Sequence, residues 1–194
     1  MTVVLHACCG PCASACVPRL AESGHAVTLL FANSNIDTEA EFERRRAAAA
    51  ELAKAEGIPF IALPYDHADW LRAVASGYEN APEKGERCAR CFRYSLAKAA
   101  DYAAAHGLEA FTTSLTVSPH KVSPVVFAAG EAAASTRPAP RFLAIDFKKK
   151  EGFKRSVQRA AALGLYRQSY CGCEFSKRKR DSSCQPFSST WTER

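Results

Sequence analysis

Apolar runs and helix-like stretches alternate along the chain. Residues 2–7 form a short apolar run that ends in a Gly/Pro/Cys loop, and an Ala/Leu-rich stretch over residues 13–23 follows. Residues 26–32 are apolar without alternation, which is typical of a strand buried on both faces of a parallel sheet. The pattern therefore predicts a strand, a loop, a helix and a second strand.

A capping box marks the next helix. Thr38 is followed three residues later by Glu41, and we expect the helix to continue to about Glu56, where Gly57 ends it. The same reasoning predicts further strands over residues 58–63, 110–114 and 141–145, and helices over residues 66–76, 87–106, 124–134 and 154–163. Strands that alternate with helices predict an α/β fold with a doubly wound, mostly parallel, Rossmann-like sheet.

Composition and charge narrow the class of protein. The chain has 194 residues, of which 47% are hydrophobic and 24% charged, as expected for one folded domain. The net charge is +6, but residues 141–180 alone carry +9. Such a basic segment suits either a nucleic-acid backbone or a solvated surface. The N-terminal apolar run has neither the length nor the flanks of a signal peptide or membrane span, so we expect a cytoplasmic protein without membrane association.

Nine cysteines fall into three separated clusters: Cys8, Cys9, Cys12 and Cys16; Cys88 and Cys91; Cys171, Cys173 and Cys184. In a chain without a secretory signal, metal or redox chemistry is a better explanation than disulfides. The first three are expected in the loop after the first strand, at the edge of the sheet where α/β proteins bind ligands. Cys16, one helical turn after Cys12, is expected to be a small buried apolar residue, and Cys184 to be incidental.

The other two clusters have metal-ligand spacing. Cys88 and Cys91 form a C-x2-C pair at a helix N-terminus, where the helix dipole favours thiolates. Cys171 and Cys173 are too close in sequence for an unstrained disulfide, but Gly172 permits a bend that points both sulfurs at one metal. Seven thiols exceed the four ligands of a zinc site or an iron–sulfur cubane. We therefore expect a four-thiolate cluster with a second metal or a redox pair, and zinc alone remains an alternative.

Six collinear sequence blocks resemble the QueH family of epoxyqueuosine reductases: residues 6–12, 35–36 with 41–45, 85–92, 111–115 with 118–121, 146–149, and 166–173 with 175–176. The resemblance implies reductive removal of the epoxide oxygen of epoxyqueuosine at a tRNA wobble position, by an iron–sulfur enzyme without cobalamin. The implied fold is of the nucleotide alpha-hydrolase or PP-loop kind. We expect residues 1–176 to be a single metal-binding catalytic domain, and residues 177–194, which lack periodicity, to be a basic flexible tail.

The chemistry implied by the resemblance assigns roles to individual residues. A 4Fe-4S cluster is expected on four thiolates among the six best-placed cysteines, with Cys12 a seventh ligand: Cys8, Cys9, Cys88, Cys91, Cys171 and Cys173. An additional mononuclear iron is expected on the remaining thiolates and Asp146, although Asp146 is equally suited to capping a turn. His120, Tyr166 and Tyr170 are candidate proton donors, with packing or base stacking as the alternative.

The implied partner is a tRNA anticodon loop that carries epoxyqueuosine. Phosphate contacts are expected from Lys121, Lys148, Lys149, Arg167 and the row Arg87, Arg90 and Arg93, and base stacking from Phe92, Tyr166 or Tyr170. The wobble base is already single-stranded, so little unpairing is needed to reach a buried centre. Because the chain has no flavin or nicotinamide fingerprint, the electron donor is expected to be external.

Two other classes of protein compete with this interpretation. An iron–sulfur tRNA sulfur-transfer enzyme of PP-loop type needs a Ser-Gly-Gly-x-Asp-Ser loop after the first strand, where this chain has its first cysteines. A non-catalytic zinc protein that binds RNA remains an alternative on spacing alone. The chain also departs from the family pattern at Ser34, where the family has Pro, and at Ser95, where it has Arg.

Overall fold

A single parallel sheet forms the centre of the molecule. The computed structural model describes residues 1–135 and 138–181. Five strands pair in the order β3-β2-β1-β4-β5, every neighbouring pair parallel. They are β1 (Thr2–His6), β2 (Ala26–Phe31), β3 (Phe60–Ala62), β4 (Ala110–Thr113) and β5 (Arg141–Phe142). The sheet confirms the predicted α/β class.

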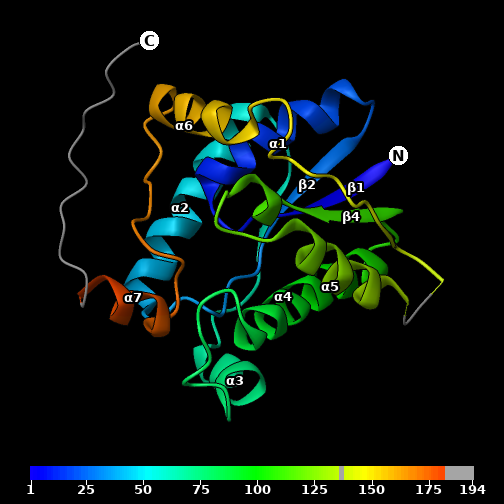
Figure 1. Cartoon of the computed structure of the whole chain (residues 1–194). Coiled ribbons are helices and arrows are strands. Elements are labelled where there is room, and N and C mark those ends of the chain that lie inside the picture. The colour runs from blue at the N-terminus through cyan, green and yellow to red at the C-terminus, as the bar shows by residue number, and fades with distance from the viewer. Residues whose placement is uncertain (136–137, 182–194) are drawn as a thin grey trace.

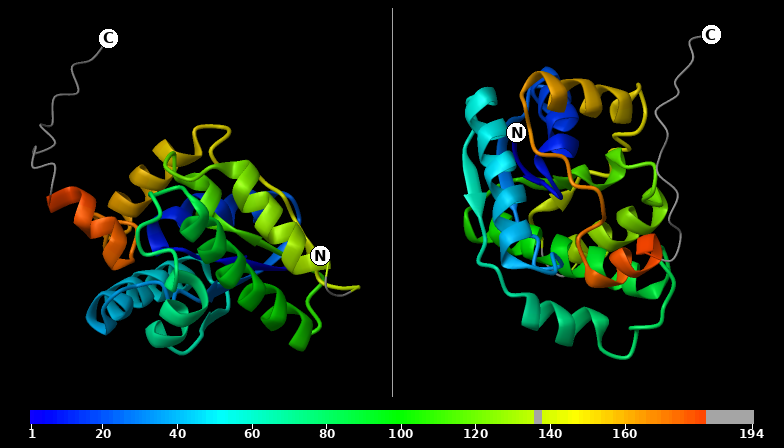
Figure 2. Two further views of the ribbon diagram at one scale, coloured as in Figure 1. Left: turned by 60° about the horizontal axis from the view of Figure 1, so that its bottom comes forward. Right: turned by 90° about the vertical axis from the view of Figure 1, so that its left-hand side faces the viewer.

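Helices cover both faces of the sheet (Figures 1 and 2). One core joins the sheet to α1 (Gly10–Glu22), α2 (Glu39–Glu56) and α6 (Gly152–Ala162). A second core joins the opposite face to α4 (Glu86–Ala105) and α5 (Ser123–Ser135). Shorter helices are α3 (His67–Trp70), which continues as a π-helical turn η1 (Leu71–Ala75), the 3₁₀ turn η2 (Ser114–Val117), and α7 (Glu174–Asp181). The doubly wound arrangement follows from helices on both faces.

The predicted caps of α2 are present. The Thr38 hydroxyl accepts a hydrogen bond from the Glu41 N–H over 3.3 Å, and Gly57 ends the helix at φ +64°. The Glu41 carboxylate, however, binds Arg45 and Arg44 instead of returning to the start of the helix. Thr38 therefore caps the helix without the reciprocal hydrogen bond of a capping box, and the Glu41 carboxylate forms ion pairs instead.

Three expected boundaries were wrong. Helix α1 begins at Gly10, so Cys12 lies in its first turn and not in a loop. Strand β5 has two residues instead of five, because Leu143 leaves the ladder after its N–H bonds Phe111. Helix α7 continues to Asp181, where irregular chain was expected after Ser176, because Lys and Arg are good helix formers even without an apolar stripe. The rest of the expected tail, with Cys184, lies outside the described residues.

The winding of the chain reverses between β1 and β4. The chain leaves β1 toward the α1 face, whereas β4 is entered from helix α4 on the opposite face. In open α/β sheets, ligands bind at the carboxyl ends of the two strands where the winding reverses. The Cys8 N–H donates to the Ser114 hydroxyl over 3.0 Å and ties the two loops together at this point. No helix in the described part of the chain is long and apolar enough to cross a membrane.

Candidate metal centre

Three thiols meet directly after β1. The Sγ atoms of Cys8, Cys9 and Cys12 all lie within 4.8 Å of one another, and those of Cys8 and Cys9 are 4.0 Å apart. The Ser114 hydroxyl also donates to the Cys8 sulfur over 3.3 Å. Three converging sulfurs in a partly buried site match the donor set that iron and zinc prefer. We call Cys8, Cys9 and Cys12 the three-thiol group.

Local backbone geometry aims these thiols. Cys9 is the N-cap of α1, and its Sγ accepts the Cys12 N–H over 3.4 Å. The next residue, Gly10, has to be glycine, because a Cβ there would lie 2.6 Å from the Ala48 carbonyl oxygen of α2. The close approach of the two helices thus depends on glycine and holds the start of α1 against α2.

One thiol of this group is favoured as a thiolate. Hydrogen bonds from Cys12 and Cys8 lower the pKa of Cys9 well below its ordinary value, even though burial opposes ionisation. For Cys12, hydrogen bonds with Cys8 and Cys9 together with burial raise the pKa, because adjacent thiolates repel. Ionisation is therefore most favourable at Cys9, and a bound cation would favour ionisation of the other two thiols.

Three of the remaining four predicted ligands, Cys171, Cys88 and Cys91, lie near Lys121, whereas Cys173 is not among the residues that line either cavity. The Lys121 ammonium donates to the Cys171 sulfur over 2.8 Å, and Cys91 and Cys173 both pack against the apolar cluster that contains Trp70. Burial alone would lower the pKa of Lys121, but the nearby thiols of Cys171, Cys88 and Cys91, when ionised, raise it above its ordinary value. We call Cys88, Cys91, Cys171 and Cys173 the four-thiol group.

The expectation that the start of α4 favours the Cys91 thiolate was wrong. Burial raises the pKa of Cys91, and the charge of Cys171 raises it further. Cys91 is the sixth residue of α4, which begins at Glu86. The helix dipole acts within the first turn, so burial dominates at this distance.

A buried ion pair holds the segment that carries Cys171. Arg45 and Glu41 are each 1% exposed and bond over 2.8 Å. Arg45 also donates to the carbonyls of Cys171 and Tyr170, and the Tyr166 hydroxyl donates to Glu41 over 2.9 Å. Sequence reasoning included Arg45 and Glu41 in a family block but gave them no role. Both are charged positions of α2 whose burial only the tertiary structure reveals.

The bend at Gly172 is confirmed. Its φ of +139° lies in a region that favours glycine, and a Cβ would come within 2.8 Å of the Asn35 amide nitrogen. The Asp37 N–H also donates to the Gly172 carbonyl over 3.0 Å. The bend therefore places Cys171 and Cys173 against the loop that follows β2.

A cavity of about 440 Å³ opens at these strand ends. Five of the seven predicted ligands line it, namely Cys8, Cys9, Cys12, Cys91 and Cys171, and Cys88 lines a smaller cavity beside it. Polar walls come from His6, Asn33, Asn35, Ser95 and Gln168. Of these, Gln168 carries a buried amide oxygen without a partner among the described residues. A volume of this size is ordinary for a small-molecule site.

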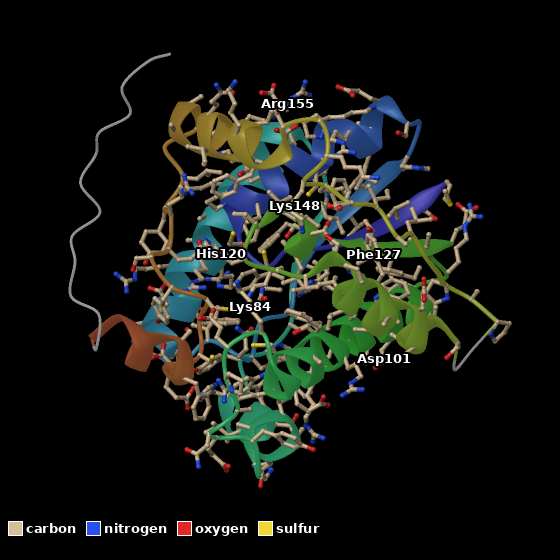
Figure 3. The ribbon with its side chains drawn as sticks, viewed as in Figure 1. Lys84, Asp101, His120, Phe127, Lys148 and Arg155 are labelled. Carbon is tan, nitrogen blue, oxygen red and sulfur yellow. The ribbon has the colours of Figure 1, made fainter. Side chains whose placement is uncertain are left out.

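The candidate proton donors differ in their surroundings. His120 is exposed and lines both cavities, and its label lies between those of Lys148 and Lys84 in the view of Figure 3. Tyr170 also lines the main cavity, but its hydroxyl donates to Asp37 over 2.6 Å. Tyr166 is not among the lining residues, and its hydroxyl is held by Glu41. His120 is thus the candidate that lines the cavity and whose imidazole is not bonded to a carboxylate within the described part of the chain.

Asp146 occupies the turn-capping position. Its carboxylate accepts the Lys148 N–H over 3.1 Å and lies 4.0 Å from the Lys148 ammonium. It follows β5 by four residues and is not among the residues that line the main cavity. The geometry therefore favours the turn-capping alternative, and a metal role for Asp146 stays a prediction.

Several predicted phosphate contacts are engaged inside the protein. Lys148 donates to the Lys121 carbonyl and the Ser123 hydroxyl. Arg87 and Arg90 donate to backbone carbonyls of residues 73–81, and Arg93 pairs with Glu86. Among the expected phosphate-binding residues, Lys149, Arg167 and the ion-paired Arg93 are exposed, and Arg167 lines the main cavity. Cys16 is fully buried in the α1 core, as expected.

The fold and this site together indicate the class of protein. A parallel α/β sheet that collects thiols from three segments around a cavity at its carboxyl edge is typical of an α/β enzyme whose cysteines could bind a metal. The family model described as epoxyqueuosine reductase QueH matches residues 3–179. The chain belongs to this family of oxidoreductases.

Curated relatives carry the same description, epoxyqueuosine reductase QueH. The protein of Haemophilus influenzae is 35% identical over 91% of this chain and 71% of its own length. That of Streptococcus pyogenes is 33% identical over 90% and 69%. That of Dehalococcoides mccartyi is 33% identical over 92% of this chain and 93% of its own length. These similarities confirm the resemblance drawn from the sequence blocks.

Proposed function

We propose that this chain reduces epoxyqueuosine to queuosine at the wobble position of a tRNA. Two electrons and two protons enter, both C–O bonds of the epoxide break, a carbon–carbon double bond forms, and the oxygen leaves as water. The observation that carries the proposal is the cavity lined by five cysteines from three distant segments. Family membership supplies the substrate class, and the thiols supply the means to hold a redox group.

The two groups of cysteines suit two metal sites. The four-thiol group has the ligand number of a 4Fe-4S cluster, and the three-thiol group leaves room for an adjacent mononuclear iron with an open position. When bound, the cluster would transfer electrons from an external donor and the iron would polarise the C–O bond. Cys9, whose thiolate is favoured, would be an anionic ligand of the iron.

The residues of the cavity would orient the substrate. Asn35 and Gln168 offer amide groups for the hydroxyls and ring nitrogens of the modified base, and His120 can supply a proton from the wall of the cavity. Tyr166 acts indirectly, since its hydroxyl holds Glu41 and thereby the segment of Cys171. Asp146 would shape the turn that holds Lys148 and take no part in the chemical step.

The anticodon loop of tRNA would reach the cavity from its exposed side. Arg167 lines the cavity and is exposed, and Lys149 is exposed at the turn before α6. Cations at these positions suit phosphates on either side of a base that enters the cavity. The single-stranded wobble base can turn inward at low cost.

The test begins with protein purified without oxygen. We expect brown protein with stoichiometric iron and sulfide that converts epoxyqueuosine in tRNA to queuosine when dithionite replaces the donor. Cys16→Ala is the matched control because its thiol is buried outside the cavity. Colourless protein that holds only zinc would contradict the proposal and favour an RNA-binding role. Nucleoside analysis of tRNA from cells that lack the protein should show epoxyqueuosine in place of queuosine.

A further inference from the structure

Lys121 occupies an unusual place for a lysine of a basic RNA-binding protein. It lies between η2 and α5, and its ammonium is 2.8 Å from the sulfur of Cys171. It lines both the main cavity and the smaller cavity that contains Cys88. The side chain is thus directed at the four-thiol group and not toward solvent.

Both ends of this contact are fixed by other residues. The Lys148 ammonium donates to the Lys121 carbonyl over 2.9 Å and to the Ser123 hydroxyl over 2.6 Å. The Arg45 guanidinium holds the Cys171 carbonyl over 3.0 Å. Ordering a long lysine side chain costs conformational entropy. An exposed ion pair contributes too little free energy to offset that cost, so the contact of Lys121 with Cys171 differs from an ordinary surface pair.

The hydrogen-bond donors at Cys88 and Cys91 are uncharged, whereas Cys173 lies near the Arg87 guanidinium without a hydrogen bond to it in the described part of the chain. The Cys88 sulfur accepts the Lys84 backbone N–H over 3.3 Å. The Trp70 indole N–H interacts with the Cys91 thiol, and Cys173 packs against the same apolar cluster as Trp70. Backbone and indole donors add hydrogen bonds but no net charge. Lys121 adds a full positive charge to a ligand sulfur.

We propose that Lys121 is a positioning residue for the redox group, which it makes easier to reduce, and not a phosphate contact. The inference rests on the proposed function. Each electron that enters a thiolate-bound cluster adds one negative charge, and a cation at a ligand sulfur stabilises the reduced form more than the oxidised form. The hydrogen bond also fixes the direction of the Cys171 sulfur, as partners of metal ligands commonly do.

Three variants separate charge from structure. Lys121→Gln removes the charge and keeps an N–H donor, Lys121→Arg keeps the charge, and Lys54→Met removes an exposed lysine of α2 as the control. Potentials would be measured by spectroelectrochemistry on iron-loaded protein, together with iron per chain and tRNA affinity. At a fixed poise, the Gln variant should show a reduced-to-oxidised ratio about tenfold lower, equivalent to about 59 mV for one electron. The Arg and Lys54 variants should stay near the parent, and all should bind tRNA normally.

An iron-loaded Gln variant with the parental potential would overturn the proposal, as would weaker tRNA binding with no change in potential. If the Gln variant retains too little iron, Lys148→Met, which frees the backbone of Lys121, should lower the potential in the same direction, and an unchanged value would count against the proposal. A parent protein without iron and sulfide would contradict the proposed function itself. An unshifted potential in a loaded variant contradicts only the role of Lys121.

Discussion

Arg45 donates a hydrogen bond of 3.0 Å to the carbonyl of Cys171, a residue 126 positions later in the chain. The same guanidinium is paired with Glu41 inside the protein. One buried cation of α2 thus holds the C-terminal cysteine segment in place. The position of Cys171, a predicted metal ligand, therefore depends on Arg45, which is not itself a predicted ligand.

Replacing Arg45 by Met should therefore destabilise the protein strongly. The change removes the buried partner of Glu41 and leaves its carboxylate to Arg44 and the Tyr166 hydroxyl; breaking a buried ion pair costs up to about 3–5 kcal/mol. Urea unfolding would measure the decrease in stability. Arg46→Met is the matched control, since Arg46 pairs with Glu43 at the surface and such pairs contribute about 0–1 kcal/mol. Equal effects of the two changes would contradict the assigned role of Arg45.

Iron content should separate ligand cysteines from the buried one. Cys88→Ala should lose most of its iron and colour, Cys12→Ala should lose part of its iron, and Cys16→Ala should keep both. The reason is that Cys16 packs in the α1 core, away from the cavity. Iron and sulfide per chain, with visible absorption, are the measurements. A Cys88→Ala protein with full iron and colour would rule out the four-thiol group as a metal site.

Asp146→Asn distinguishes turn capping from metal binding. Asparagine keeps an oxygen that can accept the Lys148 N–H, so the turn should survive and iron per chain should remain at the parental level. Turnover with excess dithionite should also stay near normal. A decrease in iron with intact cluster absorption and tRNA affinity would instead make Asp146 a ligand of the second metal.

Exposed and buried cations should differ in their effect on tRNA binding. Lys149→Ala combined with Arg167→Ala should weaken binding and reduce the steepness of its salt dependence, by about one unit for each phosphate that is no longer neutralised. Arg155→Ala is the control of like charge, because Figure 3 shows Arg155 on the outer side of α6. A double variant with parental affinity and salt slope would move the RNA surface elsewhere.

Acid should weaken the attachment of α7. Burial opposes ionisation of Asp37, but hydrogen bonds from Lys177 and Tyr170 lower its pKa below the ordinary 3.8. The stabilisation is therefore complete above that pH and is lost as the pH falls through the lower folded-state pKa. The difference in unfolding free energy between parent and Asp37→Asn should shrink from about pH 5 to about pH 3.

Glu39→Gln provides the control for acid effects, since it changes an exposed carboxylate at the first residue of α2, two positions after Asp37. Its effect should be small at both pH values. A pH-independent difference between the parent and Asp37→Asn would show that the carboxylate charge is not what matters at this position.

Local sequence signals were sufficient to predict the parallel sheet and its main helices. The unbroken apolar run at β2 and the cap at Thr38 identified a parallel sheet and a major helix because their causes lie within a few residues. The position of the first cysteines at a strand end followed from the same pattern. The bend at Gly172 was also predictable, because only glycine adopts such a conformation readily between two closely spaced cysteines.

Long-range partners could not be predicted in this way. Lys121 and Lys148 belong to a basic sequence, and only the fold shows that their ammonium groups point inward to Cys171 and Ser123. Cys91 was expected to benefit from a helix dipole, but its depth in α4 leaves burial dominant. Charge along a sequence does not report which side of a surface a flexible side chain chooses.

The separation of the cysteine clusters along the chain sets an order of events during biosynthesis. Residues 166–173 are among the last of the domain to leave the ribosome, and they dock onto α2 through Arg45. Since chains emerge from the N-terminus, the three-thiol group can form while Cys171 and Cys173 of the four-thiol group are still absent. A cluster held by the four-thiol group would therefore assemble only after Cys171 and Cys173 have emerged, and its presence would report that their segment has docked onto α2.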